Sequence, residues 1–203
     1  MSAAAAIHRP DPDLVDQRVV LRGVTWDAYE SLLAARGESS AVRVTYLEGT
    51  VELMAPSRYH ELDKTRLARL IEAWADEHDV VLEGYGSWTV KNEEAERGAE
   101  ADECYVIGAH DPDRIVAPHI AIEVVWTSGG IDKLEVWRKL GVREVWIWDA
   151  GALTFHALRG ERYEAIERSE LLPELDPALL VEPMGAASQT AAIRQLREAL
   201  RGG

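Results

Sequence analysis

The chain has 203 residues, 47% of them hydrophobic and 29% charged, which suits one globular domain of ordinary composition. Its single cysteine, Cys104, excludes an intramolecular disulfide and a cysteine-based zinc site, and it favours a reducing, cytoplasmic location. The sequence contains no run of apolar residues long enough to span a membrane. The net charge of −14 argues against nucleic-acid binding, because phosphate contacts need lysine and arginine.

The N-terminal region is predicted to be a tail followed by a strand and a helix. Residues 1–18 have too short an apolar stretch for a signal peptide, and we expect them to form a flexible tail. Residues 19–22 (VVLR) have the composition of a short strand. Thr25 is a typical N-cap for a helix that continues to about residue 35 and ends before Gly37.

A β-hairpin and a long helix are predicted next. Residues 42–48 (VRVTYLE) and 51–54 (VELM) are rich in β-branched residues and flank a turn at 49–50. Residues 59–78 carry apolar side chains at helical spacing, which predicts an amphipathic helix. Its apolar stripe consists of Leu67, Leu70, Ile71, Trp74 and Ala75.

The second half of the chain is predicted to contain several strands and one well-defined helix. Residues 119–126 (HIAIEVVW) form the most apolar, β-branched run and predict a central strand. The other predicted elements are extended segments at 80–83 and 87–91, a polar loop at 92–102, a strand at 103–108, a helix at 131–140, a strand at 143–149, a further hairpin and a helix at 188–200.

The order of these elements predicts an α/β or α+β fold with a mixed central β-sheet flanked by helices. The strand at 119–126, the helix at 131–140 and the strand at 143–149 form a predicted crossover unit. We expect one domain over residues 19–185 and a C-terminal helical extension over residues 186–203.

Glu123 is the most informative polar residue, because it interrupts an otherwise apolar strand. Asp102 lies at a predicted loop-to-strand boundary, and Lys133 lies in the helix that follows the strand of Glu123. If the two strands are neighbours, two carboxylates converge at one edge of the sheet, where they suit Mg²⁺ or Mn²⁺. Taken alone, Asp102 and Lys133 are more typical of structural or surface roles, whereas Glu123 favours a functional one.

Three segments of the sequence resemble the Uma family of restriction-endonuclease-like proteins. The segments are 46–61 (YLEGTVELMAPSRYHE), 98–108 (GAEADECYVIG) and 120–149 (IAIEVVWTSGGIDKLEVWRKLGVREVWIWD). The resemblance spans roughly residues 20–180 and implies the PD-(D/E)XK nuclease fold. It also implies a Mg²⁺- or Mn²⁺-dependent endonuclease acting on DNA. In that interpretation Asp102 and Glu123 bind the metal and Lys133 assists the attacking water.

Two positions depart from the superfamily motif. Val125 stands where the simple motif has its lysine, and Lys133 matches variants in which the lysine has moved to the following helix. Ala101 stands where the motif has proline. The resemblance marks Glu48 as a residue that extends the metal shell or orients a water, and His60 as a proton shuttle or phosphate contact. Both are equally compatible with surface or capping roles.

Three functions stay open at this stage. The first is a metal-dependent DNA endonuclease. The second is a catalytically inactive nuclease-fold protein that acts as an interaction module, which the net charge of −14 favours. The third is a two-carboxylate hydrolase with a different substrate. A homodimer is a separate hypothesis, because enzymes that cut duplexes often pair two sites and hairpins offer edges for pairing.

Overall fold

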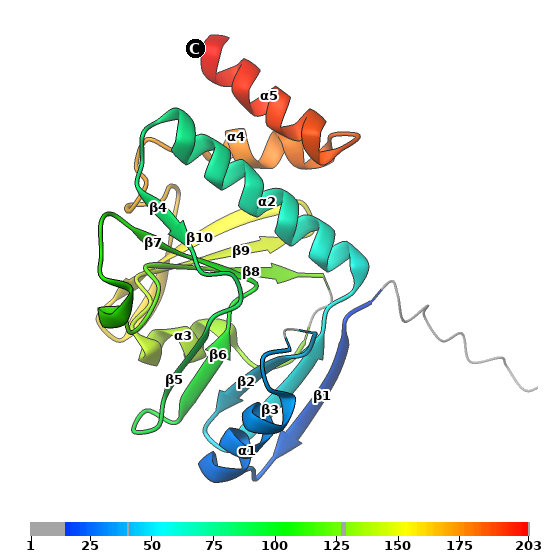
Figure 1. Cartoon of the computed structure of the whole chain (residues 1–203), viewed down its shortest axis with the longest axis vertical. Helices are drawn as coiled ribbons and strands as arrows, with labels where there is room; N and C mark the ends of the chain where they lie inside the picture. Colours follow the sequence, from blue (N-terminus) through cyan, green and yellow to red (C-terminus); the bar gives the residue numbers. More distant parts are fainter. Residues whose placement is uncertain (1–14, 40, 127–128, 203) are drawn as a thin grey trace, which may run out of the picture.

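The computed structural model describes residues 15–39, 41–126 and 129–202, which form two β-sheets and their covering helices (Figure 1). The larger sheet contains β4 (Leu82–Gly84), β7 (Glu103–Ile107), β8 (Ile120–Val125), β9 (Glu144–Asp149), β10 (Ala152–Arg159) and β11 (Arg162–Ile166). Its strand order is β11-β10-β9-β8-β7-β4. The sheet is mixed, as predicted, because β8 and β9 are parallel and the other pairs are antiparallel.

The smaller sheet is antiparallel and was not predicted as a separate layer. It contains β1 (Gln17–Arg22), β2 (Arg43–Leu47), β3 (Thr50–Ala55), β5 (Thr89–Asn92) and β6 (Arg97–Glu100), in the order β1-β3-β2-β6-β5. Strands β2 and β3 are the predicted hairpin.

Helices lie on both faces of the larger sheet. The helices of the described chain are α1 (Trp26–Arg36), α2 (Arg58–Glu77), α3 (Lys133–Leu140), α4 (Pro177–Val181) and α5 (Gln189–Gly202), with 3₁₀ turns η2 (Pro112–Arg114) and η3 (Glu182–Gly185). Helix α2 crosses one face of the sheet with α4 and α5 beyond it, whereas α3 lies on the opposite face (Figure 1). Helix α1 packs on the hairpin of the smaller sheet.

Alternation along β8 places its side chains in two separate cores. Ile120, Ile122 and Val124 face the main core under α2. Ala121 faces the second core, which α3 covers with Val136 and Trp137 among others. Glu123 therefore belongs to the face of the sheet that α3 covers, and it is the charged member of an otherwise apolar set.

The starts of the helices follow from capping side chains, of which Thr25 was expected from the sequence. Thr25, Ser57 and Asp132 cap the N-termini of α1, α2 and α3, each accepting a hydrogen bond from a backbone N–H three residues later. Gly141 ends α3 in the left-handed conformation, with a φ of 76°. The crossover unit of β8, α3 and β9 is confirmed.

One predicted loop is wrong in part. Residues 92–102 were expected to be a polar loop, but Arg97–Glu100 form β6, and all four residues of this strand are buried. Burial of its two charges is possible because each has a partner from elsewhere in the chain. Arg97 contacts Glu48 at 2.8 Å, and Glu100 contacts Arg36 at 2.5 Å.

Both ends of the described chain belong to the fold. β1 begins at Gln17 and Asp16 is buried, so these positions of the predicted tail at 1–18 are ordered parts of the structure. Residues 1–14 of that tail lie outside the described residues. The predicted C-terminal helix is confirmed as α5, and it buries Ala192, Ile193 and Leu196 in the main core. Among the described helices, none is long and apolar enough to cross a bilayer.

Candidate active site

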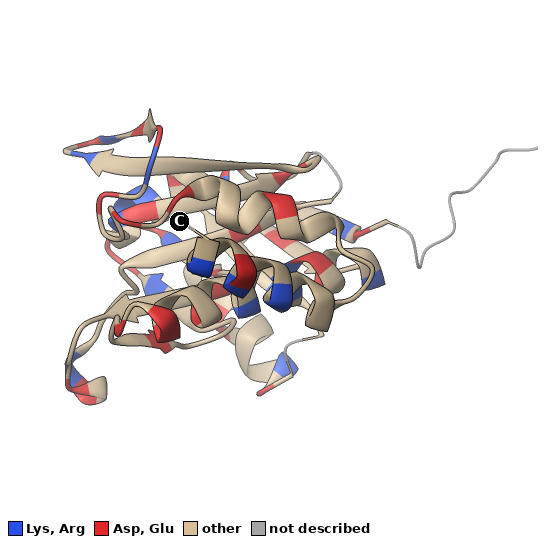
Figure 2. Ribbon diagram, turned by 90° about the horizontal axis from the view of Figure 1, so that it is seen from above, with Lys and Arg blue, Asp and Glu red and all other residues tan. Residues whose placement is uncertain are grey.

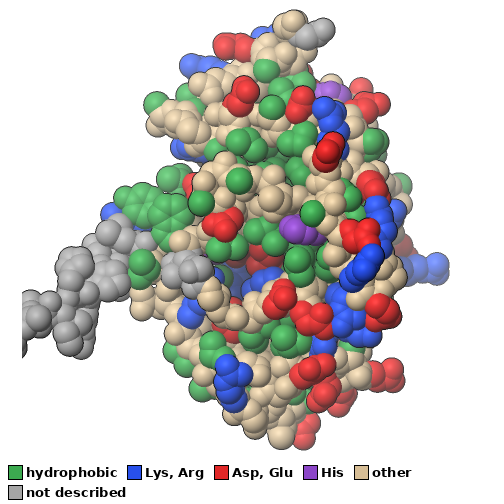
Figure 3. Space-filling model, turned by 180° about the vertical axis from the view of Figure 1, so that it is seen from behind, with side chains coloured by type: hydrophobic (Ala, Val, Ile, Leu, Met, Phe, Trp, Pro, Cys, Tyr) green, Lys and Arg blue, Asp and Glu red, His purple; other side chains and the backbone are tan. Residues whose placement is uncertain are grey.

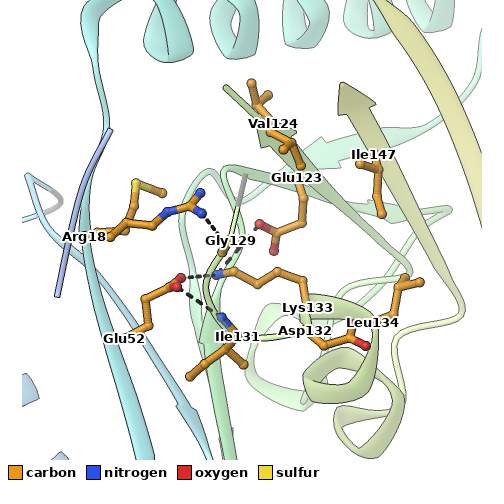
Figure 4. A pocket seen from close by; sticks show the side chains of 12 residues that line it. Arg18, Glu52, Glu123, Val124, Gly129, Ile131, Asp132, Lys133, Leu134 and Ile147 are labelled. Atoms are coloured by element: carbon orange, nitrogen blue, oxygen red, sulfur yellow. Dashed lines mark hydrogen bonds and ion pairs between the residues drawn. The ribbon is translucent and has the colours of Figure 1, made fainter. Parts of the chain in front are cut away.

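A pocket of about 260 Å³ lies where the two sheets meet (Figure 4). Strands β1 and β3 form one side, and the end of β8 with the start of α3 forms the other. Three charged side chains point toward one another inside it: Glu52 from β3, Glu123 from β8 and Lys133 from α3 (Figure 4). The structure thus brings two of the predicted residues together and adds Glu52.

Lys133 is held between two carboxylates. Its Nζ donates a hydrogen bond to Thr45 Oγ1 at 2.7 Å, and it lies 3.9 Å from Glu123 Oε2 and 4.0 Å from Glu52 Oε1. Its side chain is 17% exposed, so the stem is mostly covered while the ammonium reaches the pocket. Because Lys133 is the first residue of α3, the Asp132 cap that fixes the start of the helix also fixes this cation.

Glu123 is a buried carboxylate with too little positive charge around it. Oε1 accepts a hydrogen bond from Trp137 Nε1 at 2.7 Å. Burial raises the pKa of Glu123 to about 7, with Asp102 adding to the rise and with Lys133 and Trp137 opposing it. An additional cation in the pocket would stabilise the ionised form of this side chain.

Asp102 lies beside Glu123, as expected for neighbouring strands, but its carboxylate is occupied. The Asp102 N–H donates to Ile122 O, and Oδ2 accepts from Val124 N at 2.8 Å. Oδ1 lies 2.9 Å from His60 Nε2 and 3.6 Å from Arg43 Nε. Burial alone would raise the pKa of Asp102, but His60, the Val124 N–H and Arg43 hold it below its ordinary value.

His60 is fully buried in the first turn of α2, and both of its ring nitrogens face carboxylates. Nε2 faces Asp102, and Nδ1 lies 3.2 Å from Asp16 Oδ2. Burial lowers the pKa of His60, but the contacts with Asp102 and Asp16 outweigh it and raise that pKa to about 9. The predicted histidine therefore contacts Asp102 and does not line the pocket.

Glu48 lies outside the pocket. It occupies the turn between β2 and β3 with a φ of 42°, and its side chain is 65% exposed. Its Oε1 pairs with Arg97 Nη2 at 2.8 Å, and the same nitrogen lies 3.4 Å from Glu135 in α3. Glu48 thus connects the hairpin turn to the helix that carries Lys133.

Several side chains that contact the predicted residues were not expected from the sequence, among them Asp16, Arg43, Thr45, Glu52, Arg97 and Trp137. Trp137 lies four positions after Lys133, so helical spacing alone places both on one face of α3. Glu52 gave a weaker signal, because it alternates with Val51 and Leu53 and therefore looked like a solvent-facing strand residue. Only the packing of one sheet against the other buries it.

Glu52 also holds the backbone that leads into α3. Its Oε2 accepts from Ile131 N at 3.1 Å, while Arg18 donates to Gly129 O. A Cβ at Gly130 (φ 101°) would lie only 1.9 Å from Glu52 Oε2, whereas a Cβ at Gly129 (φ 103°) would meet nothing within 4 Å. An alanine at either position would meet a similar backbone strain, because both φ angles are positive. Only an alanine at Gly130 would also clash with the Glu52 side chain.

We therefore expect Gly130→Ala to cost about 2 kcal/mol more unfolding free energy than Gly129→Ala, because overpacking typically costs about 1–3 kcal/mol. Urea unfolding of both variants measures the difference in unfolding free energy. The strain of an alanine at positive φ is common to both variants, so it cancels in this difference. Equal losses would mean that Glu52 does not press against Gly130 in solution.

Charge around the site is mixed. In the view from above, acidic and basic positions are interspersed along the ribbons (Figure 2). The face seen from behind relative to Figure 1 has a hollow near its centre, in which Lys or Arg side chains lie beside Asp or Glu side chains (Figure 3). Within residues 15–39, 41–126 and 129–202, no group of three or more His, Cys, Asp or Glu side chains is placed to hold a metal ion.

Comparisons with known proteins identify the family and the fold. Residues 26–188 match the model of the Uma2 family, which carries the description "Putative restriction endonuclease". The solved structure of a protein from Anabaena variabilis ATCC 29413, described as "a putative nuclease belonging to DUF820", has the same fold with a TM-score of 0.52. The identity is 14%, and the match covers 85% of this chain and 99% of that chain. No curated protein matches the chain. The restriction-endonuclease-like fold expected from the sequence is thereby confirmed.

Proposed function

Because the chain belongs to the Uma2 family of restriction-endonuclease-like proteins, we propose that it is a metal-dependent endonuclease that hydrolyses DNA phosphodiester bonds. The observation that carries the proposal is the convergence of Glu123 and Lys133 on one pocket. Both residues lie within the matched region, and both were expected from the sequence.

The residues fit a hard divalent cation. Mg²⁺ and Mn²⁺ prefer oxygen ligands and are typically held by one or two carboxylates, with water completing the shell. Glu123 and the adjacent Asp102 are the proposed ligands. Glu52 faces Glu123 across Lys133, and among the described residues these carboxylates do not form a three-ligand cluster. The raised pKa of Glu123, caused first by its burial, supports this assignment, because it marks a carboxylate that lacks counter-charge. A bound cation would supply Lewis-acid polarisation of the phosphate and a lowered pKa for an attacking water.

The other proposed roles belong to side chains of the protein itself. Lys133 Nζ would donate to the attacking water or to a non-bridging phosphate oxygen, and would thereby stabilise developing negative charge. Trp137 holds the Glu123 carboxylate in position through its indole N–H. His60 and Glu48, both expected to be catalytic, are proposed to act from outside the pocket. His60 acts on Asp102, and Glu48 acts through Arg97 on the start of α3.

Removal of the metal tests the proposal directly. Purified protein should nick supercoiled plasmid in Mg²⁺ or Mn²⁺, lose this activity in excess chelator and regain it when Mg²⁺ is restored. Calorimetric titration of Mn²⁺ into the metal-free protein should show binding that Glu123→Ala removes. Nicking that persists unchanged in chelator would refute metal dependence.

A second function has one specific observation in its favour. Asp102, a proposed metal ligand, is held by His60, Arg43 and the Val124 N–H, as expected if it only supports the fold. Together with the net charge of −14, this favours a catalytically inactive interaction module. The same assay separates the two functions, since such a module would neither bind Mn²⁺ nor nick plasmid.

Homodimerisation and a cytoplasmic location belong to the same proposal. The outer strand of the smaller sheet, β1, leaves Val19, Val20 and Leu21 between 39% and 54% exposed, and an exposed apolar edge strand supports pairing with a second copy. The single cysteine, Cys104, is buried and forms no disulfide, which supports a reducing compartment.

A further inference from the structure

Asp16 is a buried carboxylate that lies before the region matched by the family model. Its side chain is 0% exposed. Oδ1 accepts a hydrogen bond from Ser57 N at 2.9 Å, and Oδ2 lies 3.2 Å from His60 Nδ1. The residue therefore contacts both the N-cap residue of α2 and the histidine in its first turn.

The contacts continue from His60 to the candidate active site. His60 is itself fully buried, and its Nε2 lies 2.9 Å from Asp102 Oδ1. The other oxygen of Asp102 accepts from Val124 N, next to Glu123 in β8. Three side chains far apart in the sequence, Asp16, His60 and Asp102, thus form one continuous buried line.

This line contacts one oxygen of the Asp102 carboxylate, which is also held by Val124 N and Arg43. An imidazole has two nitrogens on opposite sides of the ring, and here each one faces a carboxylate. A rotated or flipped ring would give up at least one of these contacts, and no solvent reaches the ring to replace it. Asp16 thereby fixes the ring, and the ring holds one oxygen of Asp102.

The segment that contains Asp16 contacts the candidate active site at a second residue, Arg18. Arg18, two residues after Asp16, lines the pocket and donates to Gly129 O before α3. Its Nη2 also lies 3.8 Å from Asp16 Oδ2. Residues on both sides of the candidate active site are therefore held by a segment that precedes the family match.

We propose that Asp16 is a positioning residue of the active site, which orients Asp102 through His60, and that the functional domain therefore extends to at least residue 16. The part that concerns metal binding rests on the proposed function. The alternative is a purely structural role, in which Asp16 only binds the Ser57 N–H at the start of α2.

Asp16→Asn separates these two roles. The amide keeps one oxygen for the Ser57 N–H but presents an NH₂ group to His60 Nδ1 in place of a carboxylate oxygen. Asp16→Ala removes both contacts. Glu144→Gln is the matched control, because Glu144 is a buried carboxylate that also accepts backbone N–H bonds, from residues 170 and 171, but contacts none of the three residues.

Two measurements are made on each variant at one fixed pH. In the metal-free protein, NMR follows the Asp102 carboxyl carbon and the ring nitrogens of His60. Calorimetry then measures Mn²⁺ affinity. We expect Asp16→Asn to shift both sets of resonances and to weaken Mn²⁺ binding by about 10–100-fold, the usual effect of losing a partner that orients a ligand. Glu144→Gln should leave the resonances and the affinity unchanged.

The outcomes are distinct. Unshifted His60 and Asp102 resonances in Asp16→Asn would overturn the positioning role, whatever the protein's metal affinity. Shifted resonances with a wild type that binds no Mn²⁺ would support positioning and refute the proposed metal-dependent function. If Asp16→Ala does not fold, Asp16→Asn still decides between the two roles, since it retains the contact with Ser57.

Discussion

Replacing Lys133 by methionine is expected to lower kcat for plasmid nicking by about 10²–10³-fold, the typical cost of removing one preorganised charge-stabilising donor from an active site. Methionine keeps an unbranched apolar stem but removes the ammonium that lies 3.9 Å from Glu123 and 4.0 Å from Glu52. The KM for DNA should change little, because this interaction is made mainly in the transition state.

The matched control for this variant is on the same helix. Lys139 of α3 is 41% exposed and pairs with Glu161 at 2.8 Å, outside the pocket. Lys139→Met removes the same charge from the same element and should leave kcat within about twofold of wild type, since exposed ion pairs contribute little. Steady-state rates at saturating Mg²⁺ compare the two, after circular dichroism has confirmed that both fold. An equal loss in both variants would show that net charge on α3, and not the pocket lysine, governs the rate.

The sequence predicted the segment around β8 and α3 because its signals are local. A β-branched run, the Asp132 cap and Gly141 define a strand, a helix start and a helix end within a few residues each. Glu123 was identified by the same logic, since a charge inside an apolar strand needs a partner. Lys133 followed from the resemblance to a known family, and the pocket places it beside Glu123.

The features that the sequence did not predict depend on contacts between distant segments. Strand β6 looked like a loop because its segment is polar and contains glycine. Its charged residues are buried against partners from distant segments, with Glu48 contacting Arg97, and with Arg36, Val44 N and Thr89 contacting Glu100. Glu52 enters the pocket because two sheets meet there. A charged residue in a short polar segment gives no local sign of such a partner, so alternation alone assigns it to solvent.

The same dependence explains the placement of Asp16. Residues 1–18 carry no periodic pattern that would predict a structured segment. Asp16 is held in the fold by two contacts with residues more than 40 positions away in the sequence. These are the hydrogen bond from Ser57 and the contact with His60. The predicted end of the tail at residue 18, which was based on composition, therefore lies within the folded part of the chain.

The pocket should also make the metal-free protein less stable as pH rises. Burial raises the pKa of Glu123 from 4.5 to about 7, so between these values the folded state holds a proton that the unfolded state has lost. Stability then falls with pH by up to about 1.4 kcal/mol per unit. The total penalty above pH 7 is on the order of 3 kcal/mol, and below pH 4.5 it vanishes.

Glu123→Gln is expected to remove this penalty. The amide can still accept the Trp137 N–H, but it carries no charge to desolvate. In excess chelator at pH 8 the variant should therefore be more stable than wild type, by up to about 3 kcal/mol, and at pH 4.5 the two should be nearly equal. Urea unfolding of both proteins at several pH values measures this difference, and Glu48→Gln, which neutralises an exposed carboxylate outside the pocket, is the control.

An unchanged pH dependence in Glu123→Gln would show that Glu123 is already compensated in the metal-free protein, by Lys133 alone. The expected result, a variant that gains stability at neutral pH while it loses Mn²⁺ binding and nicking, has a single physical cause. A buried carboxylate with insufficient counter-charge weakens the fold until a cation binds. Adding Mn²⁺ to wild type should then recover the missing stability by mass action, whereas Glu123→Gln should not respond.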